Sequence, residues 1–594
     1  METRKGMTNL ELARLMRAVA AALQIKSQLP VTRFQVIAYQ NAADAIEHLT
    51  SEAKDLWDDG ELEKIPGVGK TIAERLDELF KTGKVKHFEE TFEGLPPAMF
   101  ELMEVPGIGA KRAFRLTKEL GINKAHGALE KLAHAASKGH IRELEGFGEQ
   151  NEKEILEAVG QVKERNTRLL LPYAATIADE VIAWMKGNPN IKQIEPLGSL
   201  RRQASTVGDI DIAVAVSDDK AKEVIEHFVN YPKKQKLIEK GPISSSLLLP
   251  GGVQVDLMVQ PETHFGALLQ HFTGSKHHNV ALRTYALKKK LSLSEKGIKV
   301  GGKMEYFKTE EAFYKRLGMD WIPPELRENQ GEIELALNGK LPKLVELSDI
   351  KGDLHMHSNF PQETSHDSGV HSMAEMVAVG KELGYEYMGF SEHNPKQSEP
   401  EAKALDTLKK KLEMTQMINE KMKNDNFQVF NGMEIDIQPS GKLSLTEKGF
   451  DTLDYAIASI HSSFRGDRVE QTKRVLEGLS HPKVKIFGHP TGRMLNKREG
   501  VELDWEKVFE FCLSHNKWVE VNSSPDRLDL PDSLVFQAVK KGVKIIIGTD
   551  SHEKAWLPGM RYGVSVARRG WAQEKDVVNT LPLHEFEKVL THDV

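Results

Sequence analysis

Beyond residue 350 the chain repeats one theme: a short apolar run of strand length ends in a side chain that can bind metal, and a helical pattern follows. Strands that alternate with helices on this scale predict parallel βα units, and about seven of them favour a barrel. The carboxyl ends of the strands meet at one rim, where the active site is expected. The runs are KGDLHMH (351–357), YEYMGFSEH (385–393), QVFNGMEID (428–436), DYAIASIH (454–461), VKIFGH (484–489), KWVEVN (517–522) and VKIIIGTDSH (543–552).

The polar residues at these strand ends combine imidazoles with carboxylates, a donor set that suits Zn²⁺ or Mn²⁺ better than Mg²⁺ alone. A lone histidine is more often a surface residue or a satisfied core residue. Here nearly every predicted strand ends in a ligand, and this regularity indicates a metal site. The candidate ligands are His355, His357, Asp367, His393, Glu434, His461, His489, Asp550 and His552.

A second cluster of carboxylates is expected earlier in the chain, in GSLRRQASTVGDIDIAV (198–214). Asp209 and Asp211 stand two apart on a predicted strand, so both side chains face the same way. Asp256 in VQVDLMV can complete the set from a neighbouring strand. Three carboxylates suit Mg²⁺ together with substrate phosphates, as in two-metal phosphoryl transfer. An Asp-x-Asp pair alone would more often be a solvated strand end.

Residues 7–165 read mostly as helices, and they contain a repeated glycine turn. IPGVGKTIAERL (65–76) and VPGIGAKRAFRL (105–116) share it, and LEGFGEQNEKEIL (144–156) is a looser third copy. Adjacent glycines let backbone N–H groups approach a phosphate at the N-terminus of a helix. The glycines predicted to contact DNA in this way are Gly67, Gly69, Gly107 and Gly109.

Composition excludes several classes of protein. The 594 residues predict about four domains, and the net charge of −6 fits neither a histone-like protein nor an acidic disordered one. Any nucleic-acid binding must therefore come from local sites. Cys512 is the single cysteine, which rules out an intramolecular disulfide and suits a reducing compartment. No apolar run has the length of a membrane span, so we expect a cytoplasmic protein without membrane contact.

GSLRRQASTVGDID, GGVQVDL and HFTGSKHHNVALR (271–283) together closely resemble the DNA polymerase beta-like family X polymerases. The resemblance implies that Asp209 and Asp211 hold both metal ions of the polymerase site. It implies that Asp256 holds the ion at the primer 3′-hydroxyl and accepts its proton. His271 departs from the tyrosine of the vertebrate repair enzyme, so the same discrimination against ribonucleotides is not expected.

The same resemblance implies a set of nucleotide contacts in this chain. They are Ser199, Arg202 and Gly208 at the triphosphate, Phe272 and Gly274 at the sugar, Asn279 at the minor-groove edge of the incoming base, and Arg283 at the template strand.

The glycine turns resemble the helix-hairpin-helix elements of this family, and AYQNAADAI (38–46) resembles its 5′-phosphate-binding helix. Arg75 stands where lyase-active relatives carry the Schiff-base lysine. A guanidinium that stays protonated cannot form that imine, so deoxyribose-phosphate lyase activity is not expected. The nearby Lys70 is a poor substitute for the nucleophile, because it is predicted to lie in the turn.

DLHMHS, SEH, GMEID, SIHSS, GHPTGR and GTDSH, in this order, resemble the polymerase and histidinol phosphatase (PHP) domain over residues 350–594. All nine ligand positions of that family are filled, which implies a three-metal cluster. Two features depart from the usual form: the loop between His357 and Asp367 is slightly long, and SEH replaces Thr-Asp-His. Arg493 is predicted to neutralise the substrate phosphate. A family X core followed by a PHP domain is the arrangement of bacterial family X polymerases.

We therefore expect a multidomain chain. Its predicted parts are α-helical helix-hairpin-helix domains, an α+β nucleotidyltransferase palm with a thumb, and an α/β PHP distorted barrel. The expected ranges are a lyase-like domain at 1–92, a fingers-like domain at 93–166, the palm at 167–270, a thumb-like domain at 271–346 and the PHP domain at 347–594.

The predicted function is a monomeric DNA polymerase that fills short gaps in base excision repair or end joining. Its partners would be gapped or nicked DNA and dNTPs, with Mg²⁺ at the polymerase site and Mn²⁺ or Zn²⁺ at the PHP site. The PHP domain would remove 3′ ends and could cleave abasic sites. Two alternatives stay open: a template-independent nucleotidyltransferase fused to a small-molecule phosphatase, and a DNA-end-binding scaffold without catalysis.

Overall fold

The computed structural model describes residues 9–26, 30–47, 53, 57, 60–65, 67–103, 105, 107–125, 127–144, 146–165, 168–217, 219–364, 366–496, 498 and 500–591. The chain divides into two compact units: Met1–Thr167 with Leu249–Val253, and Arg168–Leu248 with Gln254–Val594. Pro66, Pro106 and Glu145 of the repeated turns lie outside the described residues. Among the helices that are described, none has the length and hydrophobicity needed to cross a membrane.

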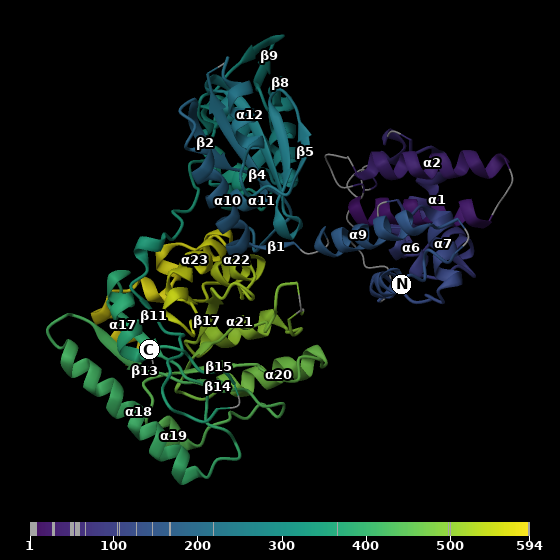
Figure 1. Cartoon of the computed structure of the whole chain (residues 1–594). Helices are drawn as coiled ribbons and strands as arrows, with labels where there is room; N and C mark the ends of the chain where they lie inside the picture. The colour runs from purple at the N-terminus through teal and green to yellow at the C-terminus, as the bar shows by residue number, and fades with distance from the viewer. Residues whose placement is uncertain are drawn as a thin grey trace. The chain divides into compact units, whose positions relative to one another are not determined.

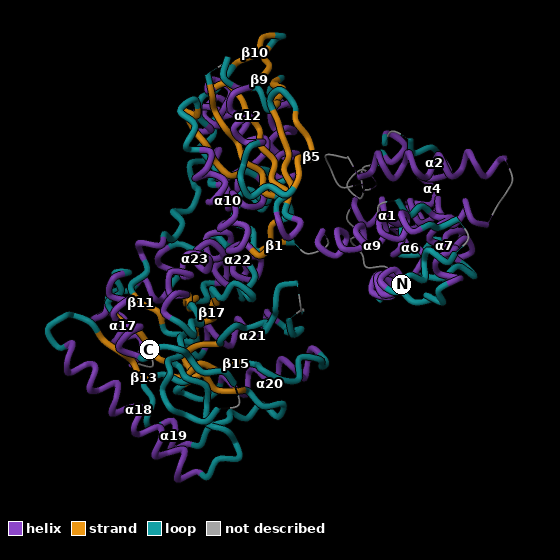
Figure 2. The backbone as a smooth tube through the Cα atoms, viewed as in Figure 1, coloured by secondary structure: helices purple, strands orange, loops and turns teal. Residues whose placement is uncertain are grey.

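The first unit consists of helices and short loops (Figure 2). Its side chains form two apolar cores, and α1 contributes to both, with Leu12 and Met16 in one core and Ala21 in the other. The predicted boundary at residue 92 separates α5 from α6 and stays a prediction. The helices are α1 (Asn9–Lys26), α2 (Pro30–Glu47), α4 (Lys70–Thr82), α5 (Lys86–Phe92), α6 (Ala98–Leu102), α7 (Ala110–Glu119), α8 (Ala128–Ser137) and α9 (Glu149–Arg165).

The second unit begins with a five-stranded sheet in the order β2-β4-β7-β6-β5. Strands β4 and β7 are parallel, and the other neighbours are antiparallel. Helices α10 and α12 pack against this sheet. The elements are β1 (Leu169–Leu170), α10 (Leu171–Met185), β2 (Ile191–Pro196), α11 (Gly198–Arg201), β3 (Thr206–Val207), β4 (Ile210–Val216), α12 (Ala221–Val229), β5 (Lys236–Lys240), β6 (Ser244–Leu248) and β7 (Gln254–Pro261).

A smaller antiparallel sheet, in the order β10-β9-β8, follows with four helices around a core that contains Phe313 and Tyr314. Trp571, from the far end of the sequence, packs against the same core. The elements are α13 (Phe265–Thr273), α14 (Lys276–Lys288), β8 (Leu291–Ser294), β9 (Gly297–Val300), β10 (Lys303–Glu305), α15 (Glu310–Leu317) and α16 (Glu332–Leu337).

Eight parallel strands form a barrel in the described part of the chain beyond residue 350, as two hydrogen-bonded groups. Parallel bridges from His393 to Glu434 and from Met356 to Ser551 join the groups at both junctions. The strands are β11 (Gly352–Asp353), β12 (Tyr387–Phe390), β13 (Gln428–Asn431), β14 (Glu434–Asp436), β15 (Ala456–Ser459), β16 (Val484–Phe487), β17 (Trp518–Asn522) and β18 (Ile545–Gly548).

Helices surround the barrel strands (Figure 1). They are α17 (Met373–Glu382), α18 (Glu401–Met422), α19 (Glu447–Phe450), α20 (Arg468–Leu479), α21 (Trp505–Ser514), α22 (Asp532–Lys541), α23 (Met560–Arg569) and α24 (Leu583–Thr591). With the helical first unit and the α+β sheets, this α/β barrel confirms the predicted fold class.

The strand count differs from the sequence prediction because QVFNGMEID is two strands, divided at Gly432. A Cβ at Gly432 would overlap the Tyr455 ring, and the Gly432 carbonyl accepts a hydrogen bond from the buried Lys411 ammonium. Both contacts come from distant segments, so the division had no local sequence signal.

An apolar cluster fills the barrel away from the ligand-bearing strand ends. Tyr387 and Trp518, the first residues of β12 and β17, belong to it together with Phe586 of α24. The Phe586 ring is fully buried and stacks on Tyr387 with 4.3 Å between centroids. The last helix therefore closes the end of the barrel that lies opposite the ligands.

We expect Phe586→Ala to lower the free energy of unfolding of the PHP part by about 3–5 kcal/mol, because it removes a buried ring and leaves a cavity. Denaturant unfolding measures this. Glu587→Ala, on the exposed side of the same helix, is the matched control and should change stability by less than about 0.5 kcal/mol. Equal effects of the two substitutions would contradict the packing role of Phe586.

Candidate functional site

Three predicted metal ligands meet at one end of the five-stranded sheet. Asp211 on β4 stands in register with Asp256 on the parallel strand β7, and Asp209 lies two residues earlier in the chain. Burial, together with the charges of Asp256 and Asp209, raises the pKa of Asp211 to about 7. Gln254 donates to both Asp256 oxygens at 3.1 Å. A divalent cation would relieve this repulsion, and all-carboxylate oxygens suit Mg²⁺.

The predicted phosphate turn, residues 198–202, comprises the short helix α11 and Arg202 after it, and it lies directly beside these carboxylates. Gly198 has a φ of +57°, and a Cβ there would lie 2.9 Å from Asp211 Oδ2, so a larger residue would collide. Ser199 follows and is half-buried, while Gly208 is exposed immediately before Asp209. The structure thus brings the predicted phosphate turn and the carboxylates together.

Arg202 is the last residue of this turn, and the C-terminal residue of α13 and Glu328 hold its guanidinium. Its Nη1 donates to the Thr273 carbonyl and lies 3.0 Å from the position of a Cβ on Gly274. Its Nε donates to Glu328 at 3.0 Å. Burial lowers the pKa of Arg202 in spite of the opposing charge of Glu328. Arg202 and Gly274, two predicted nucleotide contacts, therefore touch.

The remaining predicted nucleotide contacts surround His271. Asn279 donates to the His271 carbonyl at 2.7 Å and accepts from Gln270 at 2.8 Å. Arg283 Nη2 lies 3.2 Å from His271 Nδ1, and the Phe272 ring meets the His271 ring edge to face. Burial and the Arg283 charge lower the pKa of His271. Phe272, Asn279 and Arg283 thus share one surface of α13 and α14.

At the barrel rim the predicted PHP ligands come together from the ends of separate strands. Among the described residues there are four groups in which all the ligand atoms lie within 4.8 Å of one another. The groups are His355, His357, Glu434 and Asp550; Glu434, His461 and His489; His357, His393 and His552; and His366, His393 and His461.

Glu434 is a fully buried carboxylate that belongs to two of these groups. Burial alone would raise its pKa, but the imidazoles of His355, His393, His461 and His489 hold the pKa well below its ordinary value. Its Oε1 accepts from His489 Nε2 at 2.7 Å. An anionic carboxylate among imidazoles is a suitable bridging ligand for two cations.

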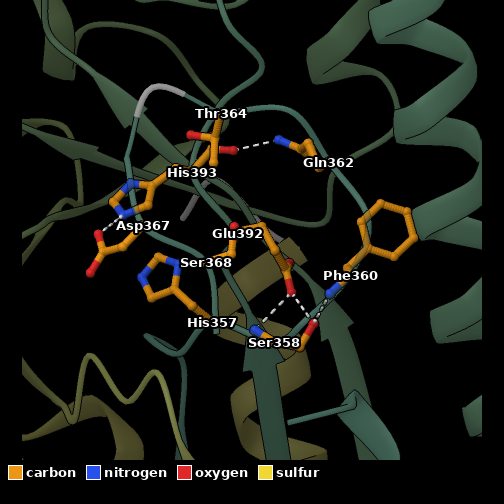
Figure 3. A pocket seen from close by; sticks show the side chains of 9 residues that line it. All are labelled: His357, Ser358, Phe360, Gln362, Thr364, Asp367, Ser368, Glu392 and His393. Atoms are coloured by element: carbon orange, nitrogen blue, oxygen red, sulfur yellow. Dashed lines mark hydrogen bonds and ion pairs between the residues drawn. The ribbon is translucent and has the colours of Figure 1, made fainter. Parts of the chain in front are cut away.

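Asp367 reaches the rim from the loop after His357 (Figure 3). Its carboxylate oxygens lie 3.7 Å from His393 Nε2 and 3.5 Å from His552 Nε2. The longer loop therefore still delivers its ligand. Burial and the nearby His393 and His552 rings depress the pKa of His357 well below its ordinary value, which favours the neutral, metal-binding form.

Several buried ligand atoms at the rim have no hydrogen-bond partner among the described residues, although buried polar atoms are normally satisfied. This donor set of imidazole nitrogens and a carboxylate oxygen fits Zn²⁺ or Mn²⁺. The atoms are His355 Nε2, His357 Nδ1 and Nε2, His393 Nδ1, Glu434 Oε2, His489 Nδ1 and His552 Nε2.

The sequence prediction missed residues that orient these ligands. Glu520 on β17 lies 2.7 Å from His355 Nδ1, and Asp436 on β14 lies 2.7 Å from His461 Nδ1. His366, beside a predicted ligand, lies 3.0 Å from both Asp436 oxygens. Carboxylates that hold a ligating imidazole fix its tautomer and orientation. Glu520 and Asp436 stood in the strand-end runs and could have been proposed.

The Ser-Glu-His departure has a structural reason. Glu392 is buried, accepts from Ser358 Oγ at 2.5 Å and pairs with the Lys411 ammonium at 2.6 Å (Figure 3 shows the Ser358 contact). Lys411 on α18 is itself fully buried. Glu392 therefore anchors the strand end that carries His393, and its charge is neutralised by a partner from a neighbouring helix.

The predicted phosphate role of Arg493 stays a prediction, and two nitrogen atoms of its guanidinium are already used inside the protein. It donates to the carbonyls of Arg527 at 2.9 Å and of Leu528. Arg527 is the nearer cation, with Nε 3.9 Å from Asp550 Oδ2. The buried Nη1 of Arg527 has no hydrogen-bond partner in the part of the chain that the structure describes. Arg493 positions the segment that brings Arg527 to the rim.

The first glycine has the same left-handed backbone conformation in all three glycine turns of the first unit, including the looser third copy. Gly67, Gly107 and Gly146 have φ of +81°, +84° and +78°, which only glycine adopts without strain. The second glycine of each turn directly precedes a helix, α4, α7 or α9. Glycines where an added Cβ would meet nothing within 4 Å are Gly69, Gly107, Gly109 and Gly148. Packing therefore does not require these four to lack a side chain.

Four family descriptions match parts of the chain. A helix-hairpin-helix domain matches residues 7–85, and a SAM-like helix-hairpin-helix tandem matches residues 99–160. The DNA polymerase beta thumb matches residues 268–328, and the PHP domain matches residues 353–524.

Three relatives extend this picture. The DNA polymerase/3′-5′ exonuclease PolX of Bacillus subtilis is 32% identical over 584 residues, which is 98% of this chain and 99% of the relative. DNA polymerase lambda of Rattus norvegicus is 25% identical over 354 residues, 54% of this chain and 56% of its own length. A Clostridium acetobutylicum protein named as a phosphatase is 29% identical over 190 residues, 30% of this chain and 72% of its own length.

Because the pKa of Asp211 is raised, we expect the stability of the protein to depend on pH when a chelator keeps it free of metal ions. The unfolded chain releases this proton near pH 4 and the folded protein near pH 7, so the carboxylate costs stability as pH rises through this window. Asp211→Asn removes that cost. We expect the free energy of unfolding of Asp211→Asn, relative to that of wild type, to rise by about 1–3 kcal/mol between pH 5 and pH 8. Denaturant unfolding at each pH measures this difference.

Asp320→Asn, at an exposed aspartate of the same unit, is the control and should show no such growth. An Asp211→Asn advantage that stays constant with pH would contradict the repulsion among the three carboxylates.

Proposed function

The chain belongs to the bacterial PolX family, and from this premise we propose that its two metal-competent centres divide DNA synthesis and 3′-end removal between them. The protein is a family X DNA polymerase with 3′-5′ exonuclease activity. We assign nucleotidyl transfer to Asp209, Asp211 and Asp256, and hydrolysis to the barrel rim. The observation that carries the assignment is the separation of the ligands into an all-carboxylate set and a mixed imidazole set.

In the polymerase centre, Asp209, Asp211 and Asp256 would hold Mg²⁺, which supplies Lewis-acid stabilisation of the charge that develops on phosphate. Asp256 would accept the proton of the primer 3′-hydroxyl. Ser199 and the backbone at Gly208 would donate to the triphosphate, and Arg202 would add a positive charge.

The sugar and base contacts complete the nucleotide site. Phe272 and Gly274 would line the sugar, Asn279 would face the base, and Arg283 would contact the template strand. His271, packed among these side chains, stands where it can set the discrimination against ribonucleotides.

In the hydrolytic centre, the nine rim ligands would hold Mn²⁺ or Zn²⁺, which supplies an activated water for attack on a phosphodiester. Glu520 and Asp436 would keep His355 and His461 in the ligating orientation. Arg527 would neutralise the substrate phosphate. Its guanidinium already faces the rim, so little reorganisation is needed.

The substrate we propose is gapped or nicked DNA with dNTPs, used to fill short gaps during base excision repair or end joining. The glycine turns would contact DNA phosphates through backbone amides, without reading sequence. The rim would also cleave DNA at abasic sites. The protein would not act as a deoxyribose-phosphate lyase, because Arg75 donates to the Tyr39 hydroxyl and has no amine that could form an imine. We further propose that the protein acts as a monomer in the cytoplasm.

We expect the two centres to be separable on a gapped duplex with a 5′-labelled primer, supplied with Mg²⁺ or Mn²⁺. Asp209→Ala should abolish extension in the presence of dNTPs but still shorten the primer. His355→Ala should extend but not shorten it. Each loss should reach about 100-fold or more, because each change removes a ligand of the reacting centre. Gel analysis of primer length over time measures both activities.

Extension by Asp209→Ala at the wild-type rate would overturn the assignment of nucleotidyl transfer, and unchanged shortening by His355→Ala would overturn that of hydrolysis. The named phosphatase relative favours one alternative, a rim specific for small phosphate monoesters. Competition with p-nitrophenyl phosphate decides it. Much faster cleavage of that monoester than of a DNA 3′ end would support the alternative.

The glycine turns permit a second experiment. Gly69 and Gly109 have φ of −80° and −78° and open space at the Cβ position, so alanine should fold without strain. An added methyl group would obstruct a phosphate that approaches the backbone. We expect Gly69→Ala with Gly109→Ala to weaken duplex binding by about fivefold or more, since a lost hydrogen bond is worth about 1 kcal/mol.

Fluorescence anisotropy with gapped DNA measures this affinity, and the melting temperature should not change. Gly559→Ala, at a glycine of the PHP part with a φ of −64° whose Cβ position is also open, is a control for DNA binding. Duplex affinity that stays at the wild-type value in the double variant would argue against DNA contact at these turns.

A further inference from the structure

The phosphate turn of the polymerase centre is tied to the last residue of α23, in the PHP part of the second unit. Arg569 Nη1 donates to the backbone carbonyl of Arg202 at 2.8 Å. The same guanidinium donates to Glu328 Oε1 at 3.1 Å, the oxygen that also accepts from Arg202 Nε at 3.0 Å. One carboxylate oxygen therefore serves two guanidinium groups.

Asp532 on α22 completes this group of four charges. It accepts from Arg569 Nε at 2.7 Å and pairs with Nη2 at 2.6 Å, so both remaining sides of the guanidinium are held. The side chain of Arg569 is only 9% exposed. Its pKa lies above the ordinary value because Asp532 and Glu328 outweigh the effect of burial. Two cations and two anions alternate, and their formal charges cancel.

We propose that Arg569 is a positioning residue of the polymerase reaction, which keeps Arg202 and its turn competent to receive the nucleotide triphosphate. This rests on the proposed function of Arg202 at the triphosphate. Without Arg569, Glu328 would pair with Arg202 alone and compete with an incoming phosphate for that guanidinium. The group would also carry a net charge of −1 beside an anionic substrate, which is unfavourable.

The hydrogen bond from Arg569 to the Arg202 carbonyl also fixes the position of the phosphate turn. The Arg202 carbonyl ends the turn that begins at Gly198, and that turn packs against Asp211 without room for a Cβ. Holding the carbonyl fixes the turn relative to the metal-binding carboxylates. Arg569 lies beyond the segments 268–328 and 353–524 that match the thumb and PHP families, so neither match assigns it a role.

The neighbouring Arg568 supplies a matched control. It pairs with Glu325 at 2.8 Å and donates to the Val345 carbonyl at 2.9 Å, so it also joins the PHP part to the thumb. Neither of these two bonds involves Arg202. Arg568→Gln and Arg569→Gln thus remove similar interface bonds, and only the second acts on the phosphate turn.

The test is steady-state extension of a gapped primer by the full chain, with KM for dNTP and kcat measured separately. We expect Arg569→Gln to raise KM by about 5–20-fold with kcat within about threefold of wild type, since it weakens ground-state binding of the nucleotide. The KM of Arg569→Lys should lie between those of wild type and Arg569→Gln, because an ammonium keeps the charge but lacks the planar, forked geometry of the guanidinium. Arg568→Gln should leave KM unchanged.

A double variant identifies the cause. If excess charge at Glu328 weakens dNTP binding, Glu328→Gln combined with Arg569→Gln should restore KM to within about threefold of wild type. An equal KM for Arg568→Gln and Arg569→Gln would overturn the proposal, as would a KM that the double variant fails to lower. Wild-type protein that does not extend the primer would instead refute the polymerase assignment.

Removal of 3′ ends by the PHP rim and the melting temperature report whether each variant is folded. Should Arg569→Gln fail to fold, Arg569→Lys and the double variant decide. The proposal would then be overturned if Arg569→Lys had the wild-type KM for dNTP and if adding Glu328→Gln to Arg569→Lys left that KM unchanged.

Discussion

Glu434 is a fully buried carboxylate that stays anionic because imidazoles surround it, and the hydrolytic half of the protein depends on this arrangement. Burial of one charge without partners would be very unfavourable. Parallel strands supply the partners, because the strands of the barrel end at the same rim and most of them bring one or two ligands there. Ligand atoms that have no hydrogen-bond partner among the residues described then make cation binding the means of satisfying the site.

The polymerase centre obeys the same geometric rule on a smaller scale. Asp211 and Asp256 come together because β4 and β7 are parallel and in register, although 45 residues separate them in the chain. The difference lies in the donors. Carboxylates alone repel one another and raise the pKa of Asp211, whereas imidazoles lower the pKa of Glu434. One centre therefore suits a hard cation with phosphate oxygens, and the other suits Zn²⁺ or Mn²⁺.

Prediction from sequence worked best where a local period carries the information. Alternation of strands and helices indicated the barrel, and residues at the strand ends indicated its ligands. It gave no sign that Arg493 also donates to the backbone carbonyls of Arg527 and Leu528, because those partners lie more than 30 residues away in the chain. The sequence prediction also treated β13 and β14 as one strand. The Tyr455 ring and the Lys411 ammonium, which contact Gly432 between them, come from other segments and leave no local signal.

The sequence alone determined the kind of donor at each centre and the order of the parts along the chain. These follow from residue type and spacing, which fix the side of a strand on which a group lies. Only the tertiary structure decided which groups meet. Glu520 beside His355 and Arg569 beside Arg202 are separated by 165 and 367 residues. Such contacts depend on how whole elements pack, and no local pattern encodes the partner of a buried charge.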